Sequence, residues 1–145
     1  TTMKRYFFLW AMLCTFAVNA VAQHDASKIV GVWQQVQQSK TDGHEMQLPV
    51  WKVLQSDGRF CTFLIANQSG QSIITNQGTY QLTDENTCVE HIDGSITDPE
   101  LVGKQNTLAL QFKGDDLLEV TYRIPGATRD GHEVWRRVKL ELPQP

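Results

Sequence analysis

The sequence beyond residue 28 consists of short runs of β-favouring residues, and a turn signal separates each run from the next. The turn segments are SDGR, NQSGQ, TDEN, KGDD and PGATRDGH, which supply Gly, Asp or Asn where hairpins need positive φ or a side-chain hydrogen bond to the backbone. No 3.6-residue apolar period is sustained here. Strands joined in sequence by short turns predict an antiparallel meander. The expected strands are 29–39, 47–55, 59–66, 72–76, 79–83, 87–92, 107–113, 117–124 and 133–142.

Eight or nine short strands must protect their edges, and a sheet that closes on itself does so completely. A sandwich is the rival architecture, but it needs longer crossover connections than these hairpin-length loops. One segment departs from the pattern, because Asp98 before Pro99 and Glu100, with Gly103 as a stop, predicts a single helical turn. We therefore predict an all-β fold, an antiparallel up-and-down barrel of eight to nine strands with one short helical turn.

The N-terminal segment has the features of a signal peptide. Lys4 and Arg5 follow Met3, and after them come the apolar run YFFLWAMLCTFAV and the small-residue segment NAVAQ. A membrane anchor is the alternative, but the run is short for a bilayer span and a cleavage motif follows it. We expect a signal peptide over 1–22, with two extra residues before Met3, and a single barrel domain over 23–145. The protein is then exported, to the periplasm or beyond, with no membrane insertion after cleavage.

The net charge of the domain bears on nucleic-acid binding, and the positions of its cysteines bear on disulfide formation. Removing residues 1–22 leaves 11 Lys and Arg against 16 Asp and Glu, so the formal charge changes from −3 to −5. The domain is acidic, and its densest basic segment, RRVK, alternates between two faces of a strand. It therefore lacks the continuous basic surface that nucleic-acid binding needs. Cys61 and Cys88 lie on expected strands two apart, which favours two buried free thiols over a disulfide.

The Gly31-Val32-Trp33 motif on the first strand resembles the Gly-x-Trp signature of the lipocalins and the wider calycin group. In those barrels the Trp packs across the closed end, and an Arg of the last strand lies over its indole. The apolar alternation in the last strand, EVWRRVKL, puts Arg136 on the apolar face. The resemblance therefore implies a barrel closed by Gly31, Trp33 and Arg136, with Arg137 as the alternative if the faces are reversed.

The chain from Ile29 to Leu142 is also similar to an uncharacterised lipocalin-like family of small secreted bacterial proteins. Its members share the Gly-x-Trp start and an ending of the type Glu-Val-Trp-Arg-Arg. This second resemblance implies a fold and a compartment but no reaction. The chain is shorter than typical lipocalins and has no counterpart of their C-terminal helix in ELPQP, so we expect a shallower cavity.

Aromatic side chains are the candidates for a ligand site, because they combine apolar area with polar tips. Strand alternation supports inward-facing Phe112 and Tyr122 best. Trp135 and Arg136 have opposite parity, so only one of them points into the barrel. The competing interpretation is that the aromatic side chains simply fill the interior. The expected ligand-binding residues are Trp51, Phe63, Tyr80, Phe112, Tyr122 and Trp135.

Catalytic and metal chemistry find little support in the sequence. The four histidines, His24, His44, His91 and His132, lack ligand spacing, and no nucleophile elbow, His-Glu-x-x-His motif or phosphate loop occurs. We therefore expect no enzyme activity, no cofactor and no metal. The expected function is binding of a small, mainly apolar ligand in the barrel mouth. The alternative is a filled barrel that acts as a protein-interaction module in the periplasm or at the cell surface.

Overall fold

The computed structural model describes residues 25–66, 70–123 and 128–143. The expected signal peptide over 1–22 and His24 lie outside the described residues. Within them, no helix has the length and apolar character needed to cross a membrane.

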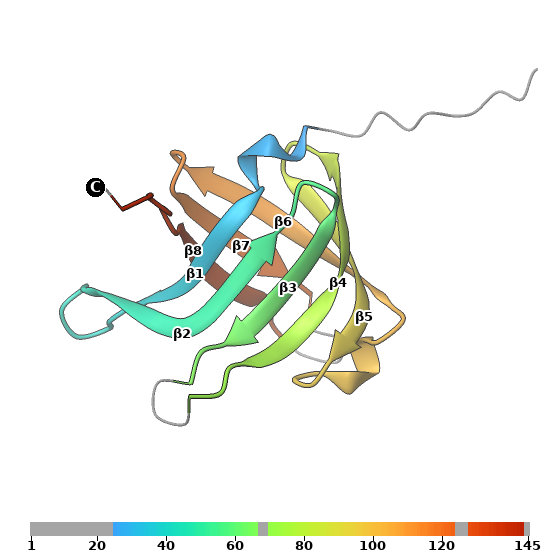
Figure 1. Ribbon diagram of the computed structural model, residues 1–145, viewed down its shortest axis with the longest axis horizontal. Helices are drawn as coiled ribbons and strands as arrows, with labels where there is room; N and C mark the ends of the chain where they lie inside the picture. Colours follow the sequence, from blue (N-terminus) through green and yellow to red (C-terminus); the bar gives the residue numbers. More distant parts are fainter. Residues whose placement is uncertain (1–24, 67–69, 124–127, 144–145) are drawn as a thin grey trace, which may run out of the picture.

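Eight strands form one closed antiparallel barrel in the described residues (Figure 1). Each strand pairs with its neighbours in sequence, and the first pairs with the last, which confirms the all-β up-and-down barrel predicted from the turn spacing. The strands are β1 (Gly31–Gln38), β2 (Glu45–Leu54), β3 (Arg59–Leu64), β4 (Ile73–Asp84), β5 (Thr87–Ser95), β6 (Gln105–Lys113), β7 (Leu117–Tyr122) and β8 (Gly131–Arg137).

Two short 3-10 turns accompany the strands. The turn η2 (Pro99–Leu101) lies in the segment where one helical turn was expected, after Asp98 and with Pro99 in its first turn. A second, η1 (Ala26–Lys28), was not expected; the Asp25 carboxylate caps it by accepting a hydrogen bond from the Ser27 amide. It precedes β1 and lies at the end of the barrel where the β2–β3, β4–β5 and β6–β7 hairpins turn. We call this end, which contains Trp33, the closed end.

The separate strands expected at 72–76 and 79–83 are one continuous strand, β4. Gly78, in the gap between those two expected strands, lies at a register shift where β5 comes unusually close. A Cβ atom at this position would lie 1.9 Å from the His91 carbonyl oxygen, so only glycine fits the bulge. At the other end of the chain, β8 ends at Arg137 instead of continuing to residue 142.

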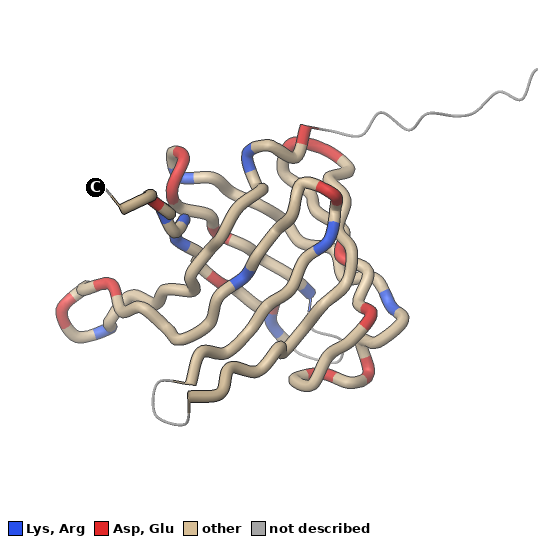
Figure 2. The backbone as a smooth tube through the Cα atoms, viewed as in Figure 1, with Lys and Arg blue, Asp and Glu red and all other residues tan. Residues whose placement is uncertain are grey.

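The interior of the barrel holds the hydrophobic core. Charged residues lie mostly at the strand ends and turns, and the strand surfaces in view carry few of them (Figure 2). Two polar residues, Thr62 and Glu90, are nevertheless buried. The buried apolar cluster comprises Ile29, Trp33, Leu54, Phe60, Tyr80, Leu82, Cys88, Ile92, Leu108, Leu110, Leu118, Val120 and Trp135.

Candidate functional site

Trp33 closes the barrel as predicted, but the cation over its indole is Arg137. The Trp33 side chain is 1% exposed, and its Nε1 donates a hydrogen bond of 2.8 Å to the Ile29 carbonyl. The Arg137 guanidinium carbon lies 4.2 Å from the centre of the indole, a cation–π contact. Gly31 is required beside it, because its φ is +138° and a Cβ there would lie 2.9 Å from Arg137 Nη1.

Backbone carbonyl groups hold the Arg137 guanidinium over the indole. Nη1 donates to Val30 O at 2.9 Å, Nε donates to Asp115 O at 3.0 Å, and Nη2 donates to Lys28 O. One side chain at the end of β8 therefore joins η1, the start of β1 and the β6–β7 turn.

The expected contact of Arg136 with Trp33 is wrong. Arg136 lies on the outer face, where its Nε and Nη2 each donate to the Glu45 carboxylate at 2.5 Å. Successive side chains of a strand point to opposite faces. Because Trp135 is 3% exposed and occupies the inner face of β8, Arg136 must point outward. The hydrogen bonds with Arg136 lower the pKa of Glu45 and raise the pKa of Arg136.

The two arginines are expected to differ in their contribution to stability. Arg137→Ala removes three hydrogen bonds and a cation–π contact at the closed end, so we expect it to lower the free energy of unfolding by about 2–3 kcal/mol. Arg136→Ala removes a pair whose arginine side chain is 42% exposed, and we expect a loss of less than about 1 kcal/mol. Urea denaturation of both variants measures the difference, and equal losses would contradict the assignment of Arg137.

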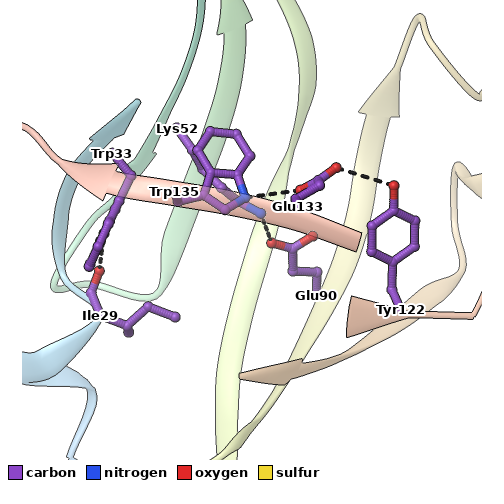
Figure 3. A network of polar contacts seen from close by, with 7 residues as sticks. All are labelled: Ile29, Trp33, Lys52, Glu90, Tyr122, Glu133 and Trp135. Atoms are coloured by element: carbon purple, nitrogen blue, oxygen red, sulfur yellow. Dashed lines mark hydrogen bonds and ion pairs between the residues drawn. The ribbon is translucent and has the colours of Figure 1, made fainter. Parts of the chain in front are cut away.

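The interior contains an ion pair, which the apolar alternation did not predict. Lys52 Nζ contacts Glu90 Oε1, with side-chain exposures of 13% and 6% (Figure 3). The ammonium group also lies 5.0 Å from the centre of the Phe60 ring and 5.9 Å from that of Trp135. Burial alone would lower the pKa of Lys52, but the Glu90 carboxylate outweighs this effect, so the pKa is raised and the lysine stays charged.

A second carboxylate extends this interior network. Glu133 accepts hydrogen bonds from Trp135 Nε1 at 3.0 Å and from Tyr122 Oη at 3.2 Å (Figure 3). Burial and then the Glu133 charge raise the pKa of Tyr122 to about 12. Burial and then the nearby Glu90 charge raise the pKa of Cys88 to about 12, which makes its thiol a poor nucleophile.

Cys61 and Cys88 are both free, as expected. Cys88 is buried inside the barrel, whereas Cys61 is partly exposed and lies between the buried residues Phe60 and Thr62 on β3. This alternation places the two thiols on opposite sides of the barrel wall.

The cavity enclosed by these interior residues is very small. Its volume is about 10 Å³, which is at the lower limit for one water molecule. The side chains around it include both members of the Lys52–Glu90 pair. It is lined by Ile29, Trp33, Lys52, Leu54, Cys88, Glu90, Leu108, Leu110, Leu118, Val120 and Trp135.

Four of the six aromatic residues expected to bind a ligand contribute to the packed interior. Trp135 and Tyr80 are buried, and Tyr80 Oη donates a 2.6 Å hydrogen bond to the Gln55 carbonyl. Phe112 and Tyr122 are partly buried and pack against the core. In this arrangement the four side chains fill the barrel.

Trp51 and Phe63, the other two residues expected to bind a ligand, do not face the interior. These two residues are paired across β2 and β3 on the outer wall, with ring centres 6.4 Å apart. Lys52 and the buried Leu54 occupy the inner face of β2, so Trp51 must point outward.

A much larger concavity lies where β1 and β8 separate, between the β1–β2 hairpin and strands β7 and β8, and residues of both faces of the barrel wall line it. Figure 1 shows this hairpin projecting from the barrel. The concavity, which we call the outer groove, has a volume of about 540 Å³. Its lining residues are Gln35, Val36, Gln37, Gln38, Glu45, Leu48, Leu117, Glu119, His132, Glu133 and Val134.

Val36 and Val134 are two of the four apolar residues that line the outer groove. They are cross-strand partners, and their parity relative to Trp33 and Trp135 puts both on the outer face. Val36 is only 4% exposed although it does not belong to the interior cluster. The sequence signal for this surface is Val36 itself, an apolar residue within a run of glutamines. It stands three positions after the inward-facing Trp33 and therefore points to the opposite face.

The outer groove is negatively charged. Its lining contains Glu45, Glu119 and Glu133 but neither Lys nor Arg. The adjacent Arg136 neutralises Glu45, and Glu133 directs its carboxylate to Tyr122 and Trp135. A net negative charge remains, because neither Glu119 on β7 nor Glu133 on β8 forms an ion pair within the described residues.

Residues 28–145 match a protein family described as "Domain of unknown function (DUF4488)". The chain belongs to this family. No curated protein matches it. The DUF4488 match starts at Lys28, so it includes the closing pair Trp33 and Arg137, the interior network and every residue that lines the outer groove.

Proposed function

We propose that this DUF4488 protein is an exported, lipocalin-like barrel that acts as a protein-interaction module and binds its partner in the outer groove. The observation that carries the proposal is the contrast in volume between the interior cavity, about 10 Å³, and the outer groove, about 540 Å³. Binding sites are concave and combine apolar surface with a few polar groups, a description that the outer groove fits.

The lipocalin-like part of the proposal rests on the closed end. A Gly-x-Trp motif at the start of β1 and an arginine from the last strand over the indole are the features that the resemblance implies, with Arg137 in the place of Arg136. The filled interior distinguishes this barrel from a carrier of lipophilic molecules. A lipophile between these strands would have to displace Trp135 or lie against the Lys52–Glu90 pair, and both changes are costly.

The charge of the outer groove indicates the chemistry of the partner. Three glutamates and no cation line it, so a partner segment that presents Lys or Arg gains electrostatic attraction and faster association. Val36, Leu48, Leu117 and Val134 supply apolar contact area, and three glutamines supply hydrogen bonds. In this proposal the protein works by binding and not by catalysis.

Fluorescence anisotropy of a labelled Lys-Thr-Lys-Val-Lys-Thr-Lys peptide tests the proposal. We expect saturable binding that weakens with added salt. Glu119→Lys reverses the charge of one of the three lining glutamates and is expected to reduce the affinity about tenfold. The matched control is Glu85→Lys, which makes the same change in the exposed β4–β5 turn and should bind the peptide like the parent protein.

Two results would contradict the outer groove as the binding site. One is the absence of saturable peptide binding. The other is an equal loss of affinity in Glu119→Lys and Glu85→Lys, which would show attraction by net charge alone. A parallel titration with oleate, followed by tryptophan fluorescence, addresses the mouth ligand expected from the sequence. Saturable quenching by oleate without peptide binding would favour that ligand over the interaction module.

A further inference from the structure

The seam between β1 and β8 is shorter than either strand. The register of the two strands runs from Trp33 opposite Arg137 to Val36 opposite Val134 and ends there. β1 continues to Gln38 and β8 begins at Gly131, so each strand extends beyond the seam on the same side. Over this stretch β1 stays paired with β2 and follows the projecting hairpin (Figure 1).

This geometry leaves one edge of β8 beside the outer groove. From Gly131 to Glu133, β8 is in register with β7 on one side, while its register with β1 on the other side has ended. His132 and Glu133 of β8 and Gln37 and Gln38 of β1 all line the outer groove, so the diverging edges form part of its walls. A strand edge presents a row of N–H and C=O groups that can pair with another chain.

We propose that the partner segment binds as an added β-strand along the edge of β8 at His132 and Glu133, in extended conformation and with Lys or Arg side chains. The proposal rests on the proposed function and specifies how the partner binds. In strand addition, main-chain hydrogen bonds provide affinity and alternate side chains provide specificity. The pairing would continue the sheet past the point where β1 leaves it.

The carboxylates are placed to select basic side chains on both faces of such a strand. Glu119 lies on the outer face of the barrel wall, as its cross-strand partner Val134 shows. Glu133 lies on the inner face, where it meets Tyr122 and Trp135. Because side chains of an added strand alternate between the two faces, each face of the segment would meet a carboxylate.

Backbone methylation of the peptide separates strand addition from binding by side chains alone. Only alternate amide groups of a strand point toward one neighbour. We therefore use two versions of Lys-Thr-Lys-Val-Lys-Thr-Lys, one with N-methyl groups on residues 2, 4 and 6 and one with N-methyl groups on residues 3 and 5. One version should lose at least about tenfold in affinity, and the other should stay within about threefold of the parent peptide.

Every outcome of this experiment decides the proposal. If both methylated peptides bind like the parent peptide, or both lose affinity equally, strand addition is overturned while the outer groove remains the binding site. If the parent peptide itself does not bind, the proposed function fails, and the binding mode fails with it.

Discussion

Trp33→Ala is expected to lower the free energy of unfolding by about 3–5 kcal/mol, the cost of a large-to-small change in a packed core. The indole is 1% exposed, bonds to the Ile29 carbonyl and carries the Arg137 guanidinium on its face. Its removal leaves a cavity at the closed end and deprives Arg137 of the surface over which it lies. Urea denaturation followed by circular dichroism measures the loss.

Trp51→Ala is the matched control for this prediction. It removes the same side chain from the outer wall, where Trp51 is partly exposed and packs on Phe63. We expect a loss of roughly 1–2 kcal/mol, because only part of the apolar area is buried there. If the two variants lost equal stability, Trp33 would not be the residue that closes the barrel.

Glu90→Gln is expected to lower the free energy of unfolding by about 3–5 kcal/mol, because it leaves the Lys52 ammonium buried without its counter-charge. The double variant Lys52→Met/Glu90→Leu removes both charges and is expected to recover most of that loss, since an apolar pair of similar size is often neutral or stabilising. A double variant as unstable as the single one would show that the ion pair itself is required for folding.

The free energy of unfolding should depend on pH in opposite directions in the parent protein and in Glu90→Gln. In the parent protein the folded-state pKa of Lys52 is raised above its ordinary value of 10.5, so the pair stabilises the fold below that pH and its contribution is lost as the pH rises through the folded-state pKa. In Glu90→Gln the charge of Glu90 is lost, and we expect burial to outweigh the weaker attraction of Glu133 and to lower the folded-state pKa, so the stability of the variant should rise with pH toward 10.5. The difference in stability between the two proteins, measured from pH 7 to 10, should therefore narrow.

The barrel could be predicted from the sequence because its determinants are local. Turn residues at short intervals define sequential hairpins, and a sheet of hairpins must hide its edges. Trp33 was identifiable because Gly31 precedes it by two positions in the first strand. The strand break expected between residues 76 and 79 was wrong, because Gly78 approaches His91 of the neighbouring strand, and such a contact leaves no local signal other than the glycine itself.

The candidate site could not be predicted for a different physical reason. Inner and outer faces were assigned by the alternation of apolar residues, and Lys52 breaks that rule, since its charge is satisfied by Glu90, 38 positions away. The same rule placed Arg136 inside, whereas the buried Trp135 occupies the inner face of β8 and Arg136 points outward. The outer groove depends on where β1 leaves β8, which is a property of the bent hairpin and not of any single segment.

The position of Arg137 has a mechanical consequence. Its guanidinium ties the last strand to the carbonyl groups of Lys28 and Val30, so the two ends of the folded chain are held by the same side chain. Peeling away either terminal strand would break these contacts and uncover the indole. Fraying from the two ends is thus coupled, and we expect the protein to resist exopeptidase digestion from both directions until the whole barrel opens.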